Sequence, residues 1–217
     1  MNRKTLFIVA ASCLLLAFVG AALIFNTEQV STGQARATAN SEALIRMHSP
    51  SLGRSDAPVV IVEFLDPACE TCAAFYPLIK EMMAANRDQI RLVLRYAPFH
   101  QGSDQVVAAL EAARKQGQFW PALEKLLSVQ DDWTYRHTVQ VDRIWPHLQQ
   151  LGLDMQQLQS DMAAPEIMTR ITQDLRDAET LNVSKTPEFF VNGKSLPRFG
   201  YEPLKALVDQ ALAASRK

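Results

Sequence analysis

The sequence predicts an α/β fold with a partly parallel sheet, an inserted all-helical domain and an N-terminal transmembrane anchor. Three stretches of the chain carry this prediction. Val59 to Phe64 is a short β-branched apolar run, which is typical of a strand buried on both faces. Residues 103–180 have helical periodicity throughout, which gives too many helices for a crossover between two adjacent strands. Residues 5–25 contain no charge and are rich in Leu, Ala, Val, Ile and Phe.

The uncharged N-terminal run has the length of a transmembrane helix. Its 21 residues would span about 30 Å as a helix, which matches the hydrocarbon core of a bilayer. Arg3 and Lys4 precede the run, and no basic residue follows it until Arg36, so the positive-inside rule predicts export of the rest of the chain. We therefore expect residues 1–25 to be a signal anchor, with a cleaved signal peptide as the competing interpretation.

Length and composition limit what the rest of the chain can be. The 217 residues, nearly half of them apolar, suffice for one domain with a substantial core. A net charge of −1 offers no basic surplus of the kind that indicates nucleic-acid binding. Residues 26–54, which begin with a polar stretch low in aromatics, are expected to form a tether and N-terminal segment.

Two cysteines with C-x-x-C spacing follow the first predicted strand. Asp66-Pro67 ends that strand, and apolar residues then recur with helical spacing to about Asn86. Cys69 is thus expected at a helix N-terminus, where free backbone N–H groups and the helix dipole favour a thiolate. Cys72 follows one turn later, so it can bond to Cys69 and resolve mixed disulfides.

A zinc site, a structural disulfide and a chance pair of cysteines compete with a redox pair. A zinc site would need a second ligand pair. However, the third cysteine, Cys13, is expected to be a membrane-buried bystander, and the histidines are scattered: His48, His100, His137 and His147. A structural disulfide would suit an exported protein, and the strand–helix context argues against coincidence. We therefore expect a redox couple and no metal site.

The remaining elements follow from periodicity and turn residues. A second strand is expected at residues 91–96, and Phe99 and His100 after it could approach the cysteines. Five helices are then expected. The first covers residues 103–117 and is capped by Ser103, and the next two cover residues 120–127 and 139–151. The fourth begins at the capping box Asp154-x-x-Gln157, and the fifth begins at Pro165. Asn192-Gly193 predicts a two-residue hairpin, and Pro203 opens a terminal helix.

Together, several of these residues resemble the active site of DsbA-like thiol-disulfide oxidoreductases, which have the thioredoxin fold. The matching features are Glu63 six positions before Cys69, Asp66-Pro67-x-Cys69, Pro77 five positions after Cys72, and Thr186-Pro187 before an apolar strand. The resemblance extends from about residue 55 to residue 213. It implies a thioredoxin-like domain at residues 55–100 and 182–217 and an inserted helical domain at residues 101–181.

Three residues around the cysteines have expected roles. A buried Glu63 would have a raised pKa and could accept the Cys72 proton, although a solvent-facing position on a half-exposed strand is the alternative. The resemblance implies a cis Thr186–Pro187 bond, and the Thr186 backbone could then pair with an extended substrate chain. The catalytic residues are therefore expected to be Cys69, Cys72 and Glu63, with Thr186 and Pro187 binding substrate.

The protein is expected to be an exported, membrane-tethered thiol-disulfide oxidoreductase that needs no cofactor. Its anchor is expected in a bacterial-type inner membrane, with the catalytic domain in the periplasm. An oxidising compartment favours use as an oxidase, although Glu70 should lower the potential by roughly 20–30 mV. Expected partners are client proteins and a membrane redox protein, either a quinone-linked oxidase or a thiol reductase. The alternatives are a disulfide reductase or isomerase, a non-catalytic binding module or chaperone, and a Cu(I) carrier.

Overall fold

The computed structural model describes residues 42–216. The predicted anchor, Cys13 and the polar stretch that begins the predicted tether lie outside the described residues. Within residues 42–216, every helix is too short or too polar to cross a bilayer. The chain from Ala43 onward forms one compact unit.

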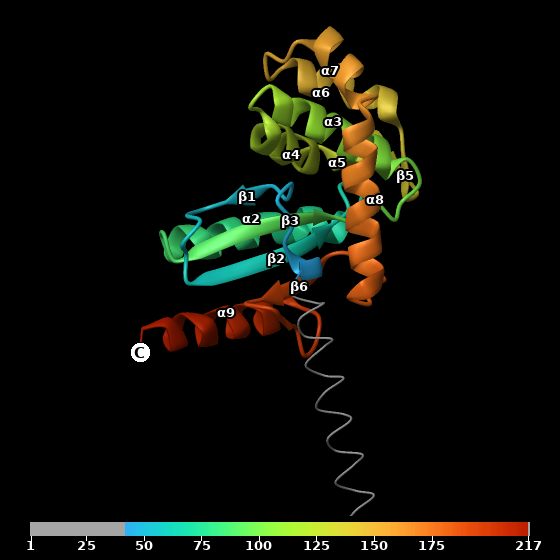
Figure 1. Ribbon diagram of the computed structural model, residues 1–217. Coiled ribbons are helices and arrows are strands. Elements are labelled where there is room, and N and C mark those ends of the chain that lie inside the picture. The colour runs from blue at the N-terminus through green and yellow to red at the C-terminus, as the bar shows by residue number, and fades with distance from the viewer. Residues whose placement is uncertain (1–41, 217) are drawn as a thin grey trace, which may run out of the picture. The chain divides into compact units, whose positions relative to one another are not determined.

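A five-stranded sheet with the order β1-β3-β2-β6-β7 forms the centre of this unit (Figure 1). Its strands are β1 Ser51–Leu52, β2 Val59–Leu65, β3 Ile90–Tyr96, β6 Glu188–Val191 and β7 Lys194–Ser195. The central strands β2 and β3 are parallel, whereas β1 and β6 add antiparallel strands on either side of that pair. Both predicted strands, β2 and β3, are confirmed to within one residue at each end.

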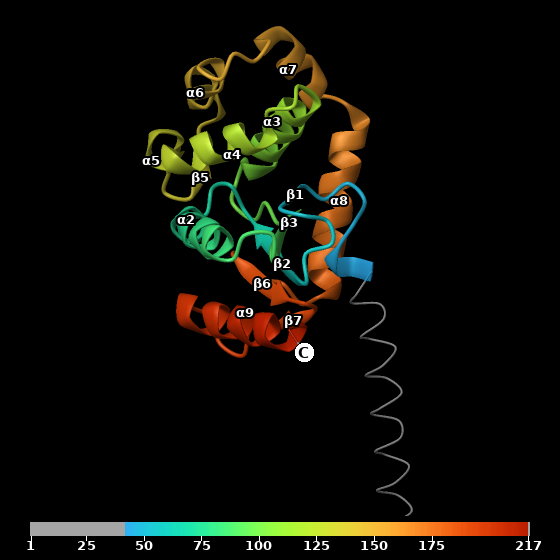
Figure 2. The same ribbon diagram turned by 90° about the vertical axis from the view of Figure 1, so that its left-hand side faces the viewer.

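Helices cover both faces of the sheet. On one face, α2 (Glu70–Ala85) and α9 (Tyr201–Ser215) pack in the same apolar cluster as Ile61 and Leu65 of β2. On the other face, Val62 and Phe64 pack with the end of α8 (Pro165–Thr180). Figure 2 shows α2 and α8 on opposite sides of β2 and β3. Because side chains alternate along a strand, Glu63 points toward the same face as Ile61 and Leu65.

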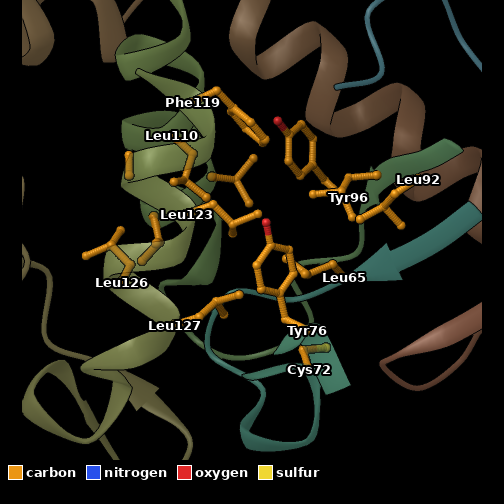
Figure 3. Packing of buried hydrophobic residues seen from close by; sticks show 14 of the residues in the cluster. Leu65, Cys72, Tyr76, Leu92, Tyr96, Leu110, Phe119, Leu123, Leu126 and Leu127 are labelled. Carbon is orange, nitrogen blue, oxygen red and sulfur yellow. The ribbon is translucent and has the colours of Figure 1, made fainter. Parts of the chain in front are cut away.

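Further helices lie between β3 and α8, and Figure 1 shows most of them gathered at one end of the sheet. These are α3 Ser103–Lys115, α4 Phe119–Ser128, α5 Gln130–Trp133, α6 Trp145–Gln149 and α7 Met155–Met162. Their core is continuous with that of the sheet, because Leu110 and Leu123 belong to the same buried cluster as Tyr96 and Cys72 (Figure 3). Burying one shared core fixes the helices against the end of the sheet that carries the cysteines.

Two details of the helical segment differ from the sequence prediction. The helix expected at residues 139–151 is shorter and broken: residues 138–139 form a strand, η1 (Val141–Arg143) is a 3-10 helix, and α6 starts only at Trp145. Pro146 accounts for the late start, because proline is tolerated in the first turn of a helix but not in its interior. Ser103 is also not a helix cap; Gly102 holds that position, and the Ser103 hydroxyl donates to Asp66 instead.

The structure contains short strands that the sequence did not predict. Besides β1, a hairpin of β4 (Thr134–Tyr135) and β5 (Thr138–Val139) follows α5. The loop after β1 requires glycine at Gly53, where φ is +95° and an added Cβ would lie 2.5 Å from the Ile90 carbonyl oxygen. This close approach holds β1 at the edge of the sheet beside β3.

The predicted turn residues behave as expected. Asn192 and Gly193 both have positive φ angles, 46° and 80°, between β6 and β7. The Asp154 side chain accepts a hydrogen bond of 2.9 Å from the Gln157 backbone N–H, which confirms the predicted cap of α7.

Candidate active site

Cys69 stands at the N-cap of α2, where the chain leaves β2. Its carbonyl accepts the first helical hydrogen bond, from Ala73 N–H at 3.1 Å, and its own N–H donates to the Asp66 carbonyl at 3.0 Å. The side chain is 6% exposed, and its Sγ lies 3.3 Å from the Thr186 carbonyl oxygen. The largely buried thiol therefore lies at the start of the helix beside the Thr186–Pro187 peptide bond, which is cis as predicted.

The two cysteines are free thiols in different environments. A hydrogen bond from the Cys72 thiol, with help from the Thr186 side chain and the backbone N–H groups of Thr71 and Cys72, lowers the pKa of Cys69 to about 5. Burial raises the pKa of the fully buried Cys72 thiol well above its usual range. At neutral pH, Cys69 is thus the thiolate and Cys72 the thiol that donates to it.

Glu63 lies behind the cysteines on β2 and is completely buried. The alternative interpretation of the sequence, in which Glu63 faces solvent on a half-exposed strand, is therefore wrong. Within residues 42–216, neither carboxyl oxygen has a hydrogen-bond partner. Burial, reinforced by the negative charge of Cys69, raises the pKa of Glu63 to about 8. The carboxyl group is thus protonated at neutral pH, and its charge is coupled to both thiols.

Asp66 organises the loop before Cys69, a role that the sequence did not indicate. Its fully buried carboxylate accepts hydrogen bonds from the backbone N–H groups of Ala68 at 2.9 Å and His100 at 2.8 Å. It also accepts from the Ser103 hydroxyl and contacts His100 Nδ1 at 2.6 Å. One side chain thereby ties the cysteine loop to the start of the helical segment.

A second group that the sequence did not bring together lies next to Cys69. The Glu70 carboxylate is 3.5 Å from His137 Nδ1, and the His137 ring stacks on His100 with centroids 5.5 Å apart. The three residues come from separate elements, so no spacing along the chain could reveal them.

The predicted site residues therefore meet at one end of the sheet. Cys69 approaches Thr186, Cys72 lies beneath Cys69, and Glu63 pairs in register with Phe189, two residues after Pro187. Such an arrangement supplies a stabilised thiolate, a second thiol that hydrogen-bonds to it and a buried carboxyl group with a raised pKa.

Comparison with known proteins identifies the family. A family model described as thioredoxin matches residues 46–210. A thioredoxin-like oxidoreductase from Silicibacter pomeroyi DSS-3 is 30% identical, with a TM-score of 0.69 over 79% of this chain and 97% of that chain. BdbD from Bacillus subtilis, at 24% identity and a TM-score of 0.67 over 76% of this chain and 93% of that chain, shares the fold.

Sequence relatives among characterised proteins are longer. The Na(+)/H(+) antiporter NhaA of Herminiimonas arsenicoxydans is 32% identical over 165 residues, which is 76% of this chain. The chain spans about a quarter of the length of such relatives. The family match and the shared fold confirm the predicted thioredoxin-like α/β architecture. The chain belongs to the thioredoxin family.

Proposed function

We propose that this protein exchanges disulfides with client proteins through Cys69 and Cys72, and that it acts mainly as an oxidase. The observation that carries the proposal is the position of Cys69 at the N-cap of α2, 3.3 Å from the Thr186 carbonyl oxygen, with Cys72 buried beneath it. Cys69 is slightly exposed and Cys72 is fully buried, which supports Cys69 as the attacked sulfur and Cys72 as the departing or resolving sulfur.

The reaction runs through a mixed disulfide. A client thiolate attacks the Cys69 sulfur of the Cys69–Cys72 disulfide, forms a new S–S bond and expels the Cys72 thiolate. A second client thiolate then attacks the client sulfur of the mixed disulfide and expels the Cys69 thiolate. The client loses two electrons and two protons, and the pair gains the two electrons. Because a thiolate of low pKa leaves readily, Cys69 favours the second step.

Glu63 supplies the proton that the buried Cys72 requires. When Cys72 is expelled as a thiolate in an apolar environment, it needs a proton, and a carboxyl group with a pKa of about 8 carries one at neutral pH. In the reverse reaction the Glu63 carboxylate accepts the Cys72 proton as that thiol attacks. The same residue therefore serves both directions.

The stabilised Cys69 thiolate supports net oxidation. At pH 7, a thiol pKa near 5 instead of 9 stabilises the reduced form by about 3 kcal/mol, which raises the potential on the order of 60 mV. The opposing effect expected from Glu70 is roughly 20–30 mV. The larger of the two effects favours a protein that donates its disulfide.

A client chain joined to Cys69 would lie beside Thr186 and Pro187. Since the Thr186 carbonyl is already directed at the Cys69 sulfur, it is available to an extended chain in the mixed disulfide. Main-chain pairing of this kind accepts many sequences, which suits an enzyme that acts on diverse unfolded clients.

The reduction potential tests the proposed direction. We expect the full-length protein, equilibrated with glutathione buffers, to have a potential between about −120 and −200 mV. It should also speed disulfide formation in a reduced, unfolded client. A potential below about −250 mV would assign the protein to the reductases. A binding module or chaperone would bind the client without changing its thiol content.

We further propose that residues 5–25 anchor the protein in an inner membrane, with the catalytic domain in the periplasm. The support is the uncharged 21-residue run after Arg3-Lys4. The tether would hold the domain near a membrane redox protein that reoxidises the cysteine pair. A reporter that is active only outside the cytoplasm, fused after Lys217, should be active and membrane-bound. Recovery of a soluble protein that begins beyond Phe25 would show cleavage instead.

A further inference from the structure

Three potential metal ligands from separate elements meet beside the cysteine pair. Glu70 is the first residue of α2, His100 follows β3, and His137 lies at the tip of the β4–β5 hairpin. One ligand atom from each lies within 4.8 Å of the other two. The thiol-exchange steps proposed above use neither imidazole, so this cluster has no assigned task.

A buried carboxylate orients the first imidazole. Asp66, which is fully buried, contacts His100 Nδ1 at 2.6 Å and also accepts from the His100 backbone N–H at 2.8 Å. An ionised carboxylate accepts hydrogen bonds, so the Nδ1 proton is held there and Nε2 keeps its lone pair. Metal-binding histidines have this arrangement, with a carboxylate on the ring nitrogen that does not bind the metal.

The hairpin holds the second imidazole in place. Arg136 and His137 both have positive φ angles, 48° and 61°, at the two positions where a tight hairpin normally has Asn-Gly. A parallel bridge between Gln101 and Thr138, with a hydrogen bond of 3.0 Å from Val139 N–H to the Gln101 carbonyl, joins the hairpin to the segment carrying His100. The stacked rings are therefore fixed by the backbone on both sides.

We propose that Glu70, His100 and His137 form a binding site for a divalent transition metal, with zinc the best fit. Two imidazoles and one carboxylate are ligands that zinc accepts with three protein groups and one open position. Calcium and magnesium prefer sites made of oxygen atoms, so they fit this cluster poorly.

The distances suit zinc after a small adjustment. Tetrahedral zinc with bonds of about 2.0–2.1 Å holds its ligand atoms about 3.3 Å apart. The Glu70–His137 separation of 3.5 Å already matches this value, and the largest allowed separation in the cluster, 4.8 Å, requires one side chain to move by roughly 1.5 Å. The exposed Glu70 side chain can make that movement, while Asp66 holds His100 and the hairpin holds His137.

Zinc titration of a thiol-free protein tests the site. In the full-length chain with Cys13→Ala and the Cys69–Cys72 pair oxidised, no thiol can bind the metal. Calorimetry with zinc chloride should then show one ion per chain. His137→Asn, which preserves tolerance of the positive φ angle, and Glu70→Gln should each weaken binding at least 10-fold. His147→Asn is the matched control, because His147 also faces an acid, Asp132 at 3.3 Å, but has no place in the cluster.

Cobalt provides a second measurement that does not depend on the variants. Co²⁺ bound in the oxidised protein should show the visible bands of nitrogen and oxygen ligation without a thiolate charge-transfer band, and zinc should displace it. Absence of saturable zinc binding would overturn the proposal. Equal affinities for the parent, His137→Asn and Glu70→Gln, with folding checked by circular dichroism, would do the same by placing the ion elsewhere.

Discussion

Two buried carboxyl sites lie on opposite faces of the same two central strands, and they differ in pairing. On the α2 face, Glu63 has no hydrogen-bond partner within residues 42–216. On the α8 face, Arg95 of β3 is fully buried and contacts Asp174 at 2.7 Å and Asp177 at 2.5 Å. Asp174 also accepts from the Tyr96 backbone N–H at 2.8 Å. The carboxylates of the second site thus have hydrogen-bond and ion partners, whereas the Glu63 carboxyl group has none within residues 42–216.

This difference in pairing indicates that the Arg95 cluster stabilises the fold, whereas Glu63 serves the chemistry of the cysteine pair. Opposite charges and hydrogen bonds compensate the desolvation of the Arg95 cluster, which joins α8 to the sheet. Nothing comparable compensates Glu63, so its burial opposes folding whenever it ionises. A protein tolerates such a group where its chemistry needs an acid that can gain and lose a proton near neutral pH.

Loss of a cysteine should have the largest effect on function and a small effect on the fold. Cys72→Ser removes the resolving thiol, so it should trap mixed disulfides with clients. Cys69→Ser removes the sulfur that a client thiolate would attack and should trap none. Both variants should lose turnover entirely. Gel analysis of alkylated cell extracts measures the adducts, and equal trapping by the two variants would contradict the assigned roles.

Removal of the arginine should have the reverse effect, a large loss of stability without loss of chemistry. Arg95→Met removes the fully buried cation from Asp174 and Asp177, which keep only the partly exposed His48 and Arg46 as ion partners within residues 42–216, and this should lower the free energy of unfolding by about 3 kcal/mol. Arg91→Met, on the same strand but only partly buried, is the control and should cost less than about 1 kcal/mol. Urea denaturation measures both. Normal turnover per folded Arg95→Met molecule is expected, and its loss would break the separation of the two sites.

The two sites should also respond oppositely to pH. The Glu63 pKa rises from 4.5 to about 8 on folding, so the folded state holds a proton that the unfolded state loses. The contribution of Glu63 to stability should therefore fall as pH rises from about 4.5 to 8, by at most about 5 kcal/mol, while the lowered pKa of Cys69 contributes with the opposite sign in the reduced protein.

Asp177 behaves in the opposite way. Burial alone would raise its pKa, but hydrogen bonds from Arg46 and Arg95 outweigh burial and lower it. Its contribution is present above the unfolded value of 3.8 and is lost as pH falls through the lower folded pKa. Denaturation from pH 3 to 9 measures both limbs. Glu63→Gln should abolish the loss between pH 5 and 8 and leave the acid limb unchanged.

The same glutamine substitution should slow catalysis. An amide fills the space of the carboxyl group but carries no exchangeable acid proton, so Glu63→Gln should reduce turnover about 100-fold. The pH–rate profile should lose the inflection near pH 8. Glu81→Gln, at an exposed position of α2, controls for a change of charge near the site. An unaltered pH–rate profile in Glu63→Gln would remove Glu63 from the mechanism.

Local sequence patterns predicted the features that depend on neighbouring residues. The β-branched run of β2 and the spacing of apolar residues in α2 specify a strand and a helix, and the break between them places Cys69 at the N-cap. Asn192-Gly193 specifies its hairpin because both residues accept positive φ. These patterns were sufficient for the cysteine pair and the sheet.

Features made by distant residues could not be predicted. The two-residue strands β1, β4 and β5 are too short to show a period of two. Asp66 was interpreted as a strand breaker and as part of the Asp66-Pro67-x-Cys69 resemblance but not as a hydrogen-bonding centre, because its partners, His100 and Ser103, lie more than 30 positions away. A charge within a buried strand indicates that a partner exists, but nothing near Arg95 in the sequence identifies α8 as its source.

The smallest expected effect concerns Glu70, which lies between the two cysteines in the sequence. It tests whether a carboxylate with a nearby partner differs from one without a partner at the surface as well as in the core. An isolated Glu70 beside the Cys69 thiolate should lower the reduction potential by roughly 20–30 mV. In the structure Glu70 lies 3.5 Å from His137, whose imidazole offsets part of that charge when it is protonated, and Glu70→Gln should then raise the potential by less than about 20 mV. His137→Asn should shift the potential in the opposite direction, because it leaves the Glu70 charge without its partner. Glutathione equilibration in the presence of EDTA, which removes any bound metal, measures both shifts. If the two substitutions shift the potential in the same direction, Glu70 and His137 do not act as a pair on Cys69. The potential would then depend on the Cys72 hydrogen bond and the helix N-terminus alone.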